Sequence, residues 1–141
     1  MIRHHFLVFF VGELKFALRL EFVERVVHAV EITPLPGASS DFLGVINVHG
    51  SIVPVVNFRA RLGLASREIR LDDRLLLVHG AEKTWAFAVD AVAGVIEPPP
   101  SEILSAGSIV PSDAAVEGLI RLPDGVLLIG DLERLFPGEA A

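Results

Sequence analysis

Residues 16–23 read FALRLEFV, and 69 positions later residues 85–92 read WAFAVDAV. The two segments share apolar residues at their first three positions, an acidic residue at the sixth and Val at the eighth, and the match extends to Val26 and Val95. A second correspondence, at an offset of about 74 residues, joins three further pairs: Gly44 with Gly118, Gly50 with Gly125, and Asn57 with Asp131. This internal repeat predicts two halves of similar design.

The alternation of residue types around the repeat predicts strands. In the segment 14–20, Phe16 and Leu18 alternate with Lys15 and Arg19, which is typical of a half-buried strand. The other segments with strand patterns are 6–11, 44–48, 52–56, 74–78, 85–89, 92–96, 118–122 and 126–129. About five strands per half are too few for an open sandwich, so we expect each half to curl into a small barrel and the two barrels to share a buried seam.

The expected fold class is therefore all-β, with two tandem five-stranded barrels and short helices. We expect one domain over residues 1–141, with approximate subdomains at 6–66 and 72–136, and exchange of strands at the termini remains an open alternative. Residues 21–27 fit a short helix by spacing and a strand by their β-branched content. Pro54 has no N–H to donate, so its strand should lie at a sheet edge or a bulge.

Composition excludes several classes of function. The 141 residues contain no Cys, which excludes disulfides, thiol catalysis and thiolate metal sites and fits a reducing compartment. With 12 Lys and Arg against 18 Asp and Glu, the net charge of −6 disfavours a nucleic-acid partner. No apolar run approaches the roughly 20 residues of a membrane span. We therefore expect a cytoplasmic protein without direct membrane insertion.

The apolar content is high, at 52%. We expect part of it to be exposed as partner-binding surface; the alternative is an unusually dry core. Trp85 shares the phase of Phe87 and Val89 and is predicted to lie in the core. Ala86 and Ala88, on the opposite face of that strand, are expected to face either a partner or the other barrel.

No pattern of residues predicts catalysis. The five His lack the spacing of metal ligands, apart from the adjacent pair His4 and His5, and no Gly-rich phosphate motif is present. Asp72 and Asp73 are interpreted as solvated loop charges. The sequence thus predicts no enzyme, no cofactor and no metal site.

The segment GVINVHGSIVPVVNFR at residues 44–59 resembles the CheW-like coupling proteins of bacterial chemotaxis, and the resemblance extends to FLVF at 6–9, ITPLP at 32–36, VAGVI at 92–96 and GLIRL at 118–122. It implies two SH3-like barrels with a groove between them. It also implies an adaptor for signal transduction, with two partners: the regulatory domain of the histidine kinase CheA and the cytoplasmic tip of chemoreceptors. Such a scaffold would be recruited from the cytoplasm to membrane receptor arrays.

The resemblance also implies a receptor-facing groove. Val23, Gly44 and Asn47 match the motif around it, although Gly44 equally fits a close backbone approach and Asn47 fits a turn-tying role. Arg25 and His49 depart from the motif, because the family commonly carries Glu and Arg there, facing one another as an ion pair. These five residues form the predicted partner-binding set.

The departure at Arg25 and His49 leaves the pathway open, because two basic side chains cannot form the usual ion pair. Ordinary chemotaxis coupling is one hypothesis. A divergent receptor set, or another chemosensory pathway such as pilus motility, is a second. A generic SH3-like peptide-binding module is a third.

Overall fold

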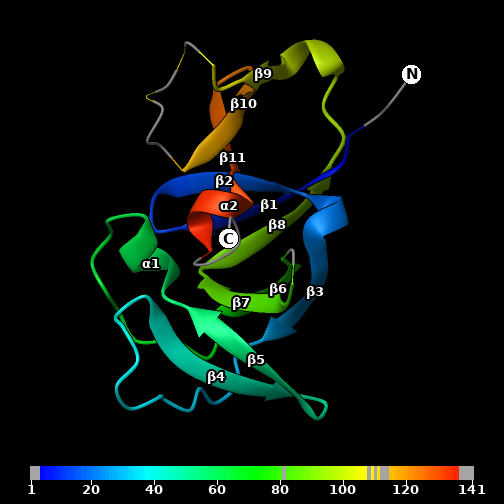
Figure 1. Cartoon of the computed structure of the whole chain (residues 1–141). Helices are drawn as coiled ribbons and strands as arrows, with labels where there is room; N and C mark the ends of the chain where they lie inside the picture. Colours follow the sequence, from blue (N-terminus) through cyan, green and yellow to red (C-terminus); the bar gives the residue numbers. More distant parts are fainter. Residues whose placement is uncertain (1–3, 81, 108, 110, 112–114, 137–141) are drawn as a thin grey trace.

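The computed structural model of the chain consists of two β-sheets, in which most neighbouring strands are antiparallel, and short helices (Figure 1). It describes residues 4–80, 82–107, 109, 111 and 115–136. The strands are β1 (Phe6–Val11), β2 (Leu14–Arg19), β3 (Val23–His28), β4 (Phe42–Val48), β5 (Ser51–Val56), β6 (Arg74–His79), β7 (Thr84–Val89), β8 (Ala91–Ile96), β9 (Ile103–Ser105), β10 (Val116–Leu122) and β11 (Gly125–Gly130). The helices are η1 (Leu20–Phe22), α1 (Phe58–Arg61), η2 (Pro100–Glu102) and α2 (Leu132–Leu135). The predicted all-β class is confirmed.

The local elements follow from the residues that form and end them. The segment that fitted both helix and strand divides into the single turn η1 and the strand β3, whose three Val favour extended backbone. Asn57 caps α1, since its side chain accepts a hydrogen bond from the Ala60 N–H at 3.2 Å. Asp131 caps α2 in the same way through the Glu133 N–H at 3.1 Å.

The sheets are not built from consecutive halves of the chain. One has six strands in the order β8-β1-β2-β11-β10-β9, and the other has five in the order β3-β6-β7-β5-β4. The N-terminal hairpin therefore lies with the last four strands, while β6 and β7 lie with β3, β4 and β5 (Figure 1). Strand membership crosses the link between 6–66 and 72–136, and those subdomain bounds remain a prediction.

The sequence repeat reappears as a repeat of strand pairing. Val23 of β3 lies opposite Val78 of β6, and Val92 of β8 lies opposite Phe9 of β1. The offset of 69 relates Val23 to Val92 and also relates Phe9 to Val78. In each pair the register then shifts by one residue, so both copies carry a bulge at the same place.

The parallel contacts obey the same symmetry. Ala17 of β2 lies opposite Ile129 of β11, and Ala86 of β7 lies opposite Val55 of β5. Ala17 and Ala86 are related by the offset of 69, and Val55 and Ile129 by the offset of 74. Each repeat thus has two blocks: a first block related to its copy by the offset of 69 and a second block related by the offset of 74. The first block of each copy pairs with the second block of the other copy, β2 with β11 and β7 with β5.

The core consists of three clusters, one of which joins the sheets. The shared cluster takes alternate residues of strands from both sheets, together with α1 and the end of α2. Its largest members are the aromatic side chains Phe9, Phe16, Phe58, Trp85, Phe87 and Phe136. The opposite faces of the same strands line one smaller cluster within each sheet. Strands β1 and β6 therefore bury both faces, which explains their nearly continuous apolar sequences.

Exposure accounts for another part of the apolar content. The exposed large apolar residues include Val26, Ile52, Val95 and Val126. Ile52 and Val126 are equivalent under the offset of 74, and Val26 and Val95 under the offset of 69. Both sheets thus present apolar side chains at related positions of their outer surfaces.

Of the local expectations, one held in part and one was wrong. Strand β5 is not an edge strand, since it lies between β4 and β7, but its ladder with β4 carries a bulge, where the register shifts between Phe42 and Gly44. Pro54 is tolerated because the ladder to β7 joins only Val55 and Val56. Ala86 and Ala88 face the small cluster of their own sheet, so neither of the two expected packings holds. Strand β8 pairs with β1 in the other sheet and not with β6 or β7.

Candidate functional site

An open hollow on the five-stranded sheet brings together two of the five predicted partner-binding residues. Its lining residues come from β3 to β7 and the turns between them: Glu24, Arg25, Val48, His49, Ser51, Ile52, Val53, Pro54, Leu77, Lys83 and Thr84. We call it the Arg25 hollow. Its volume is about 710 Å³. All its lining residues belong to one sheet, so it differs from the groove between two barrels that the resemblance implies.

The position of Arg25 follows from the bulge in β3. Because the register shifts between Val23 and Arg25, Glu24 is the additional residue on that strand. The Glu24 carboxylate accepts a hydrogen bond from the Thr84 hydroxyl at 2.8 Å and lies 3.6 Å from Nδ1 of His79. Glu24 is therefore engaged toward β6 and β7, and Arg25 is exposed at the hollow.

His49 reaches the hollow from the turn between β4 and β5. It has a φ of +51°, the one positive φ among the described residues other than Gly. The neighbouring Asn47 holds this turn, since its side-chain oxygen accepts a hydrogen bond from the Gly50 N–H at 2.8 Å. Asn47 is exposed beside the hollow without lining it.

The other two predicted residues lie away from the hollow. Gly44 is buried, and a Cβ atom there would overlap the carbonyl oxygen of Thr33. Thr33 and Val45 form an isolated bridge, so the glycine allows the 30s loop to pair with β4. Val23 is half-buried and packs against the shared core cluster.

The charges of the Arg25 hollow are unbalanced. Arg25 and Lys83 line it with no carboxylate partner among the residues that the structure describes. The Lys83 ammonium lies 5.1 Å from the centre of the Trp85 ring, which is a cation–π contact. The one acidic lining residue, Glu24, already has two partners. The floor is apolar, formed in part by the buried Val53 and Leu77.

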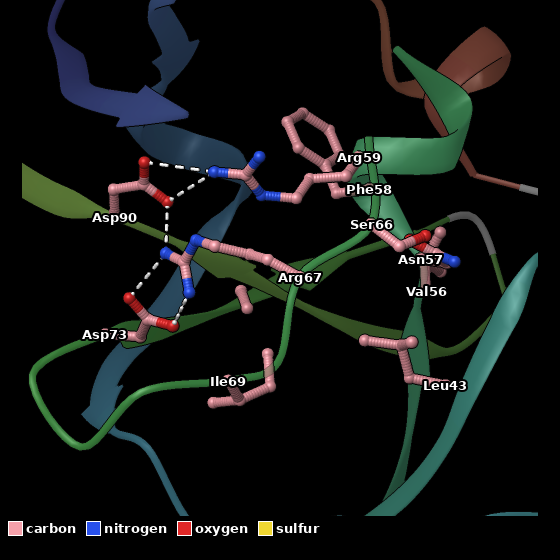
Figure 2. A pocket seen from close by; sticks show the side chains of 11 residues that line it. Leu43, Val56, Asn57, Phe58, Arg59, Ser66, Arg67, Ile69, Asp73 and Asp90 are labelled. Atoms are coloured by element: carbon pink, nitrogen blue, oxygen red, sulfur yellow. Dashed lines mark hydrogen bonds and ion pairs between the residues drawn. The ribbon is translucent and has the colours of Figure 1, made fainter. Parts of the chain in front are cut away.

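A second feature, which we call the Asp73 network, lies near the shared core and consists of Asp73, Arg67, Asp90 and Arg59. Figure 2 shows the Arg67 guanidinium between the two carboxylates. Arg67 donates two hydrogen bonds of 2.8 Å to Asp73 and one of 2.6 Å to Asp90. Arg59 donates to both oxygens of Asp90 at 3.1 Å, and the Gly12 N–H donates to Asp90 at 2.7 Å. The network thus connects α1, the loop between α1 and β6, the residue after β7 and the β1–β2 turn.

The network keeps both carboxylates ionised. Hydrogen bonding from Arg67 lowers the pKa of Asp73 and outweighs the opposing effect of burial. The hydrogen bond from the Arg70 N–H lowers this pKa further. For Asp90, burial raises the pKa, but hydrogen bonds from the Gly12 N–H, Arg67 and Arg59 outweigh it and the net pKa is lowered. The same hydrogen bond with Asp73 raises the pKa of Arg67.

The interpretation of Asp73 as a solvated loop charge was wrong, because its side chain is only 3% exposed. A sequence signal was available: Asp73 directly precedes β6 and Asp90 directly follows β7, and their neighbours Arg74 and Val89 are register partners. A hairpin of these two strands brings the carboxylates together, so a cation is required between them. The adjoining cavity measures about 40 Å³, which is room for about one water molecule.

Within the described ranges, no group of three or more His, Asp or Glu side chains is arranged to hold a metal ion. No helix of that part of the chain is long and apolar enough to cross a membrane.

Comparisons with known proteins agree on one family. The family model of the CheW-like domain matches residues 5–140. The "Chemotaxis protein CheW" of Rhizobium meliloti is 26% identical over 136 residues, covering 94% of this chain and 87% of the relative. "Protein FrzA" of Myxococcus xanthus is 32% identical over 117 residues, covering 82% of this chain and 71% of the relative. The crystal structure of the scaffolding protein TtCheW from Thermoanaerobacter tengcongensis superposes with a TM-score of 0.87 at 29% identity, covering 99% of this chain and 97% of that one.

Proposed function

The chain belongs to the CheW-like domain family, and from this premise we propose that it is a non-catalytic adaptor that couples chemoreceptors to the histidine kinase CheA in bacterial chemotaxis. The observation that carries the proposal is the agreement over almost the full length with a protein described as a scaffold, at a TM-score of 0.87. The whole fold, and not a fragment of it, is shared.

The chemistry of the described residues supports an adaptor better than an enzyme. The Asp73 network has the most strongly perturbed titratable groups, but its carboxylates are saturated by guanidinium and backbone N–H donors. Its cavity of about 40 Å³ is far below the ~300 Å³ of an ordinary small-molecule pocket. An adaptor of this kind would act by binding two kinase states with different free energies.

We place the receptor-facing surface at the predicted set of Val23, Arg25, Gly44, Asn47 and His49. Arg25 and His49 are the exposed members that line the Arg25 hollow, so they are the ones positioned for direct contact. Gly44 and Asn47 would support that surface by shaping β4 and its turn. The protein would act in the cytoplasm and be recruited to membrane receptor arrays through its partners.

A second candidate pathway is favoured by the basic character of both Arg25 and His49. The two side chains line one hollow, and neither can supply the carboxylate of the ion pair that is common in the family. The protein would then serve a divergent receptor set or another chemosensory pathway, such as pilus motility. The similarity to FrzA, a relative that is not named CheW, is consistent with this pathway.

Co-elution on a sizing column tests the adaptor function. The purified protein is mixed with the regulatory domain of the CheA encoded in the same genome, and separately with the cytoplasmic tip of a chemoreceptor. A stable complex with the kinase domain is expected, and its absence would contradict the coupler. Binding of the tip that is lost in Arg25→Ala or His49→Ala, but kept in the matched surface variant Lys15→Ala, locates the receptor contact in the hollow.

A further inference from the structure

We propose that the Arg25 hollow recognises an acidic, partly apolar segment of the chemoreceptor tip, so that carboxylates of the partner meet Arg25 and Lys83 while an apolar side chain covers Ile52. This inference rests on the proposed adaptor function and specifies the chemistry of the partner that the hollow accepts.

The first argument is charge complementarity. The chain has a net charge of −6 and would repel an acidic segment over most of its surface. Most other described Arg side chains are paired: Arg19 with Glu117, Arg61 with Asp41 and Arg121 with Glu102 are examples. Arg25 and Lys83 line the same hollow and lack a carboxylate partner within the described residues. Arg25 is thus available at the hollow, and Lys83 has the Trp85 ring as a partner in place of a carboxylate.

The second argument is that the hollow keeps an excess of positive charge, because its lining carries two cations, Arg25 and Lys83, against the single carboxylate of Glu24. Glu24 is turned toward β6 and β7, where the Thr84 hydroxyl donates to it at 2.8 Å and His79 lies 3.6 Å away. Glu24 is the additional residue of the bulge in β3, and its contacts are with Thr84 and His79 and not with the neighbouring Arg25.

The third argument is the apolar part of the surface. Ile52 is 63% exposed and lines the hollow directly beside the buried Val53. An exposed β-branched residue at the rim of a hollow with an apolar floor favours burial by a partner. A segment that carries only acidic residues would leave Ile52 in water, and a segment without acidic residues would leave two cations desolvated and unpaired. A mixed acidic and apolar segment satisfies both requirements.

A charge-swap experiment tests this inference with the purified tips of the chemoreceptors encoded in the same genome. Binding is measured by titration calorimetry for the unaltered protein, for the double variant Arg25→Glu with Lys83→Glu, and for the control Lys15→Glu with Arg70→Glu. The control reverses the same number of exposed charges outside the hollow. Trp85 fluorescence in urea verifies that each variant is folded, since this single Trp is 4% exposed.

We expect the hollow variant to bind at least about tenfold more weakly and the control to change by less than about threefold, because each reversal replaces an attraction with a repulsion. Asp or Glu to Lys substitutions in the tip are expected to restore binding to the hollow variant. Equal binding by the hollow variant and the unaltered protein would overturn the inference alone. A tip that fails to bind even the unaltered protein would overturn it together with the receptor arm of the proposed function, while the kinase co-elution would still stand as a separate result.

Discussion

Replacing Arg67 with Ala is expected to lower the free energy of unfolding by about 3 kcal/mol. The change removes both donors that Arg67 directs at Asp73 and the one that it directs at Asp90. Asp73 would keep the Arg70 N–H at 2.8 Å as its remaining described donor, at a position where its side chain is 3% exposed. The cost therefore comes chiefly from a buried carboxylate that has lost its counterion.

The magnitude follows from the unequal burial of the two carboxylates. Removing one partner of a fully buried ion pair costs roughly 3–5 kcal/mol. Arg67 is 19% exposed and its site admits some water, so the lower end of that range applies to Asp73. Asp90 is 30% exposed and keeps Arg59 and the Gly12 N–H as donors, so losing its hydrogen bond from Arg67 adds less than about 1 kcal/mol. Against a total stability of about 5–15 kcal/mol, the loss is readily measured.

Urea unfolding monitored by Trp85 fluorescence gives the free energy directly. Trp85 lies in the shared core cluster, so its signal reports loss of the contact between the sheets. Arg70→Ala is the matched control: the same residue type is removed three positions away, Arg70 is exposed, and its backbone N–H remains. We expect the control to change the stability by less than about 0.5 kcal/mol.

The double variant Arg67→Ala with Asp73→Asn distinguishes a stranded charge from lost packing. Neutralising Asp73 removes the uncompensated carboxylate, so the double variant should be more stable than Arg67→Ala alone. A loss below about 1 kcal/mol for Arg67→Ala, or a double variant no more stable than the single one, would refute the reasoning.

Three other predictions concern stability. The lowered pKa values of Asp73 and Asp90 mean that the native state binds fewer protons than the unfolded state in acid. The stability that these two carboxylates contribute is complete above the unfolded pKa of about 3.9 and is lost as the pH falls through the folded pKa values. Urea midpoints measured from pH 6 to pH 3 should therefore fall less in Asp73→Asn than in the unaltered protein. Gly44→Ala should lower the free energy of unfolding by more than about 2 kcal/mol, because its Cβ would overlap the Thr33 carbonyl. The control Gly37→Ala, with φ at +82° and open space around it, should lower it by about 1 kcal/mol. Equal losses for the two variants in thermal melts would contradict the close approach at Gly44. Asn57→Ala should cost about 1 kcal/mol through loss of the cap on α1, with Asn57→Asp nearly neutral, and a neutral Ala variant in urea unfolding would count against the cap.

Several residues of the candidate site could be predicted from the sequence, but the way in which the fold brings them together could not. Arg25 and His49 could be singled out from the motif at 44–59 and the segment around Val23, and they do line one hollow. The place of Lys83 in the lining of the hollow was not predicted, because it depends on how the turn after β6 lies relative to β3 and β5. The Asp73 network was missed for a similar reason, since its four side chains come from three separate segments.

The sequence by itself determined most of the strands, the caps and the duplicated design, because alternation of side chains, turn residues and N-cap types act over a few neighbouring residues. It left β3 open between helix and strand and did not predict β9. Even the change of offset from 69 to 74 was present in it. Only the tertiary structure decided that each block of one repeat pairs with the complementary block of the other, so that β1 and β2 join β11 and β7 joins β5. A strand's side-chain pattern specifies which faces are buried but not which strand lies beside it, and the shared aromatic cluster is formed once both sheets come together.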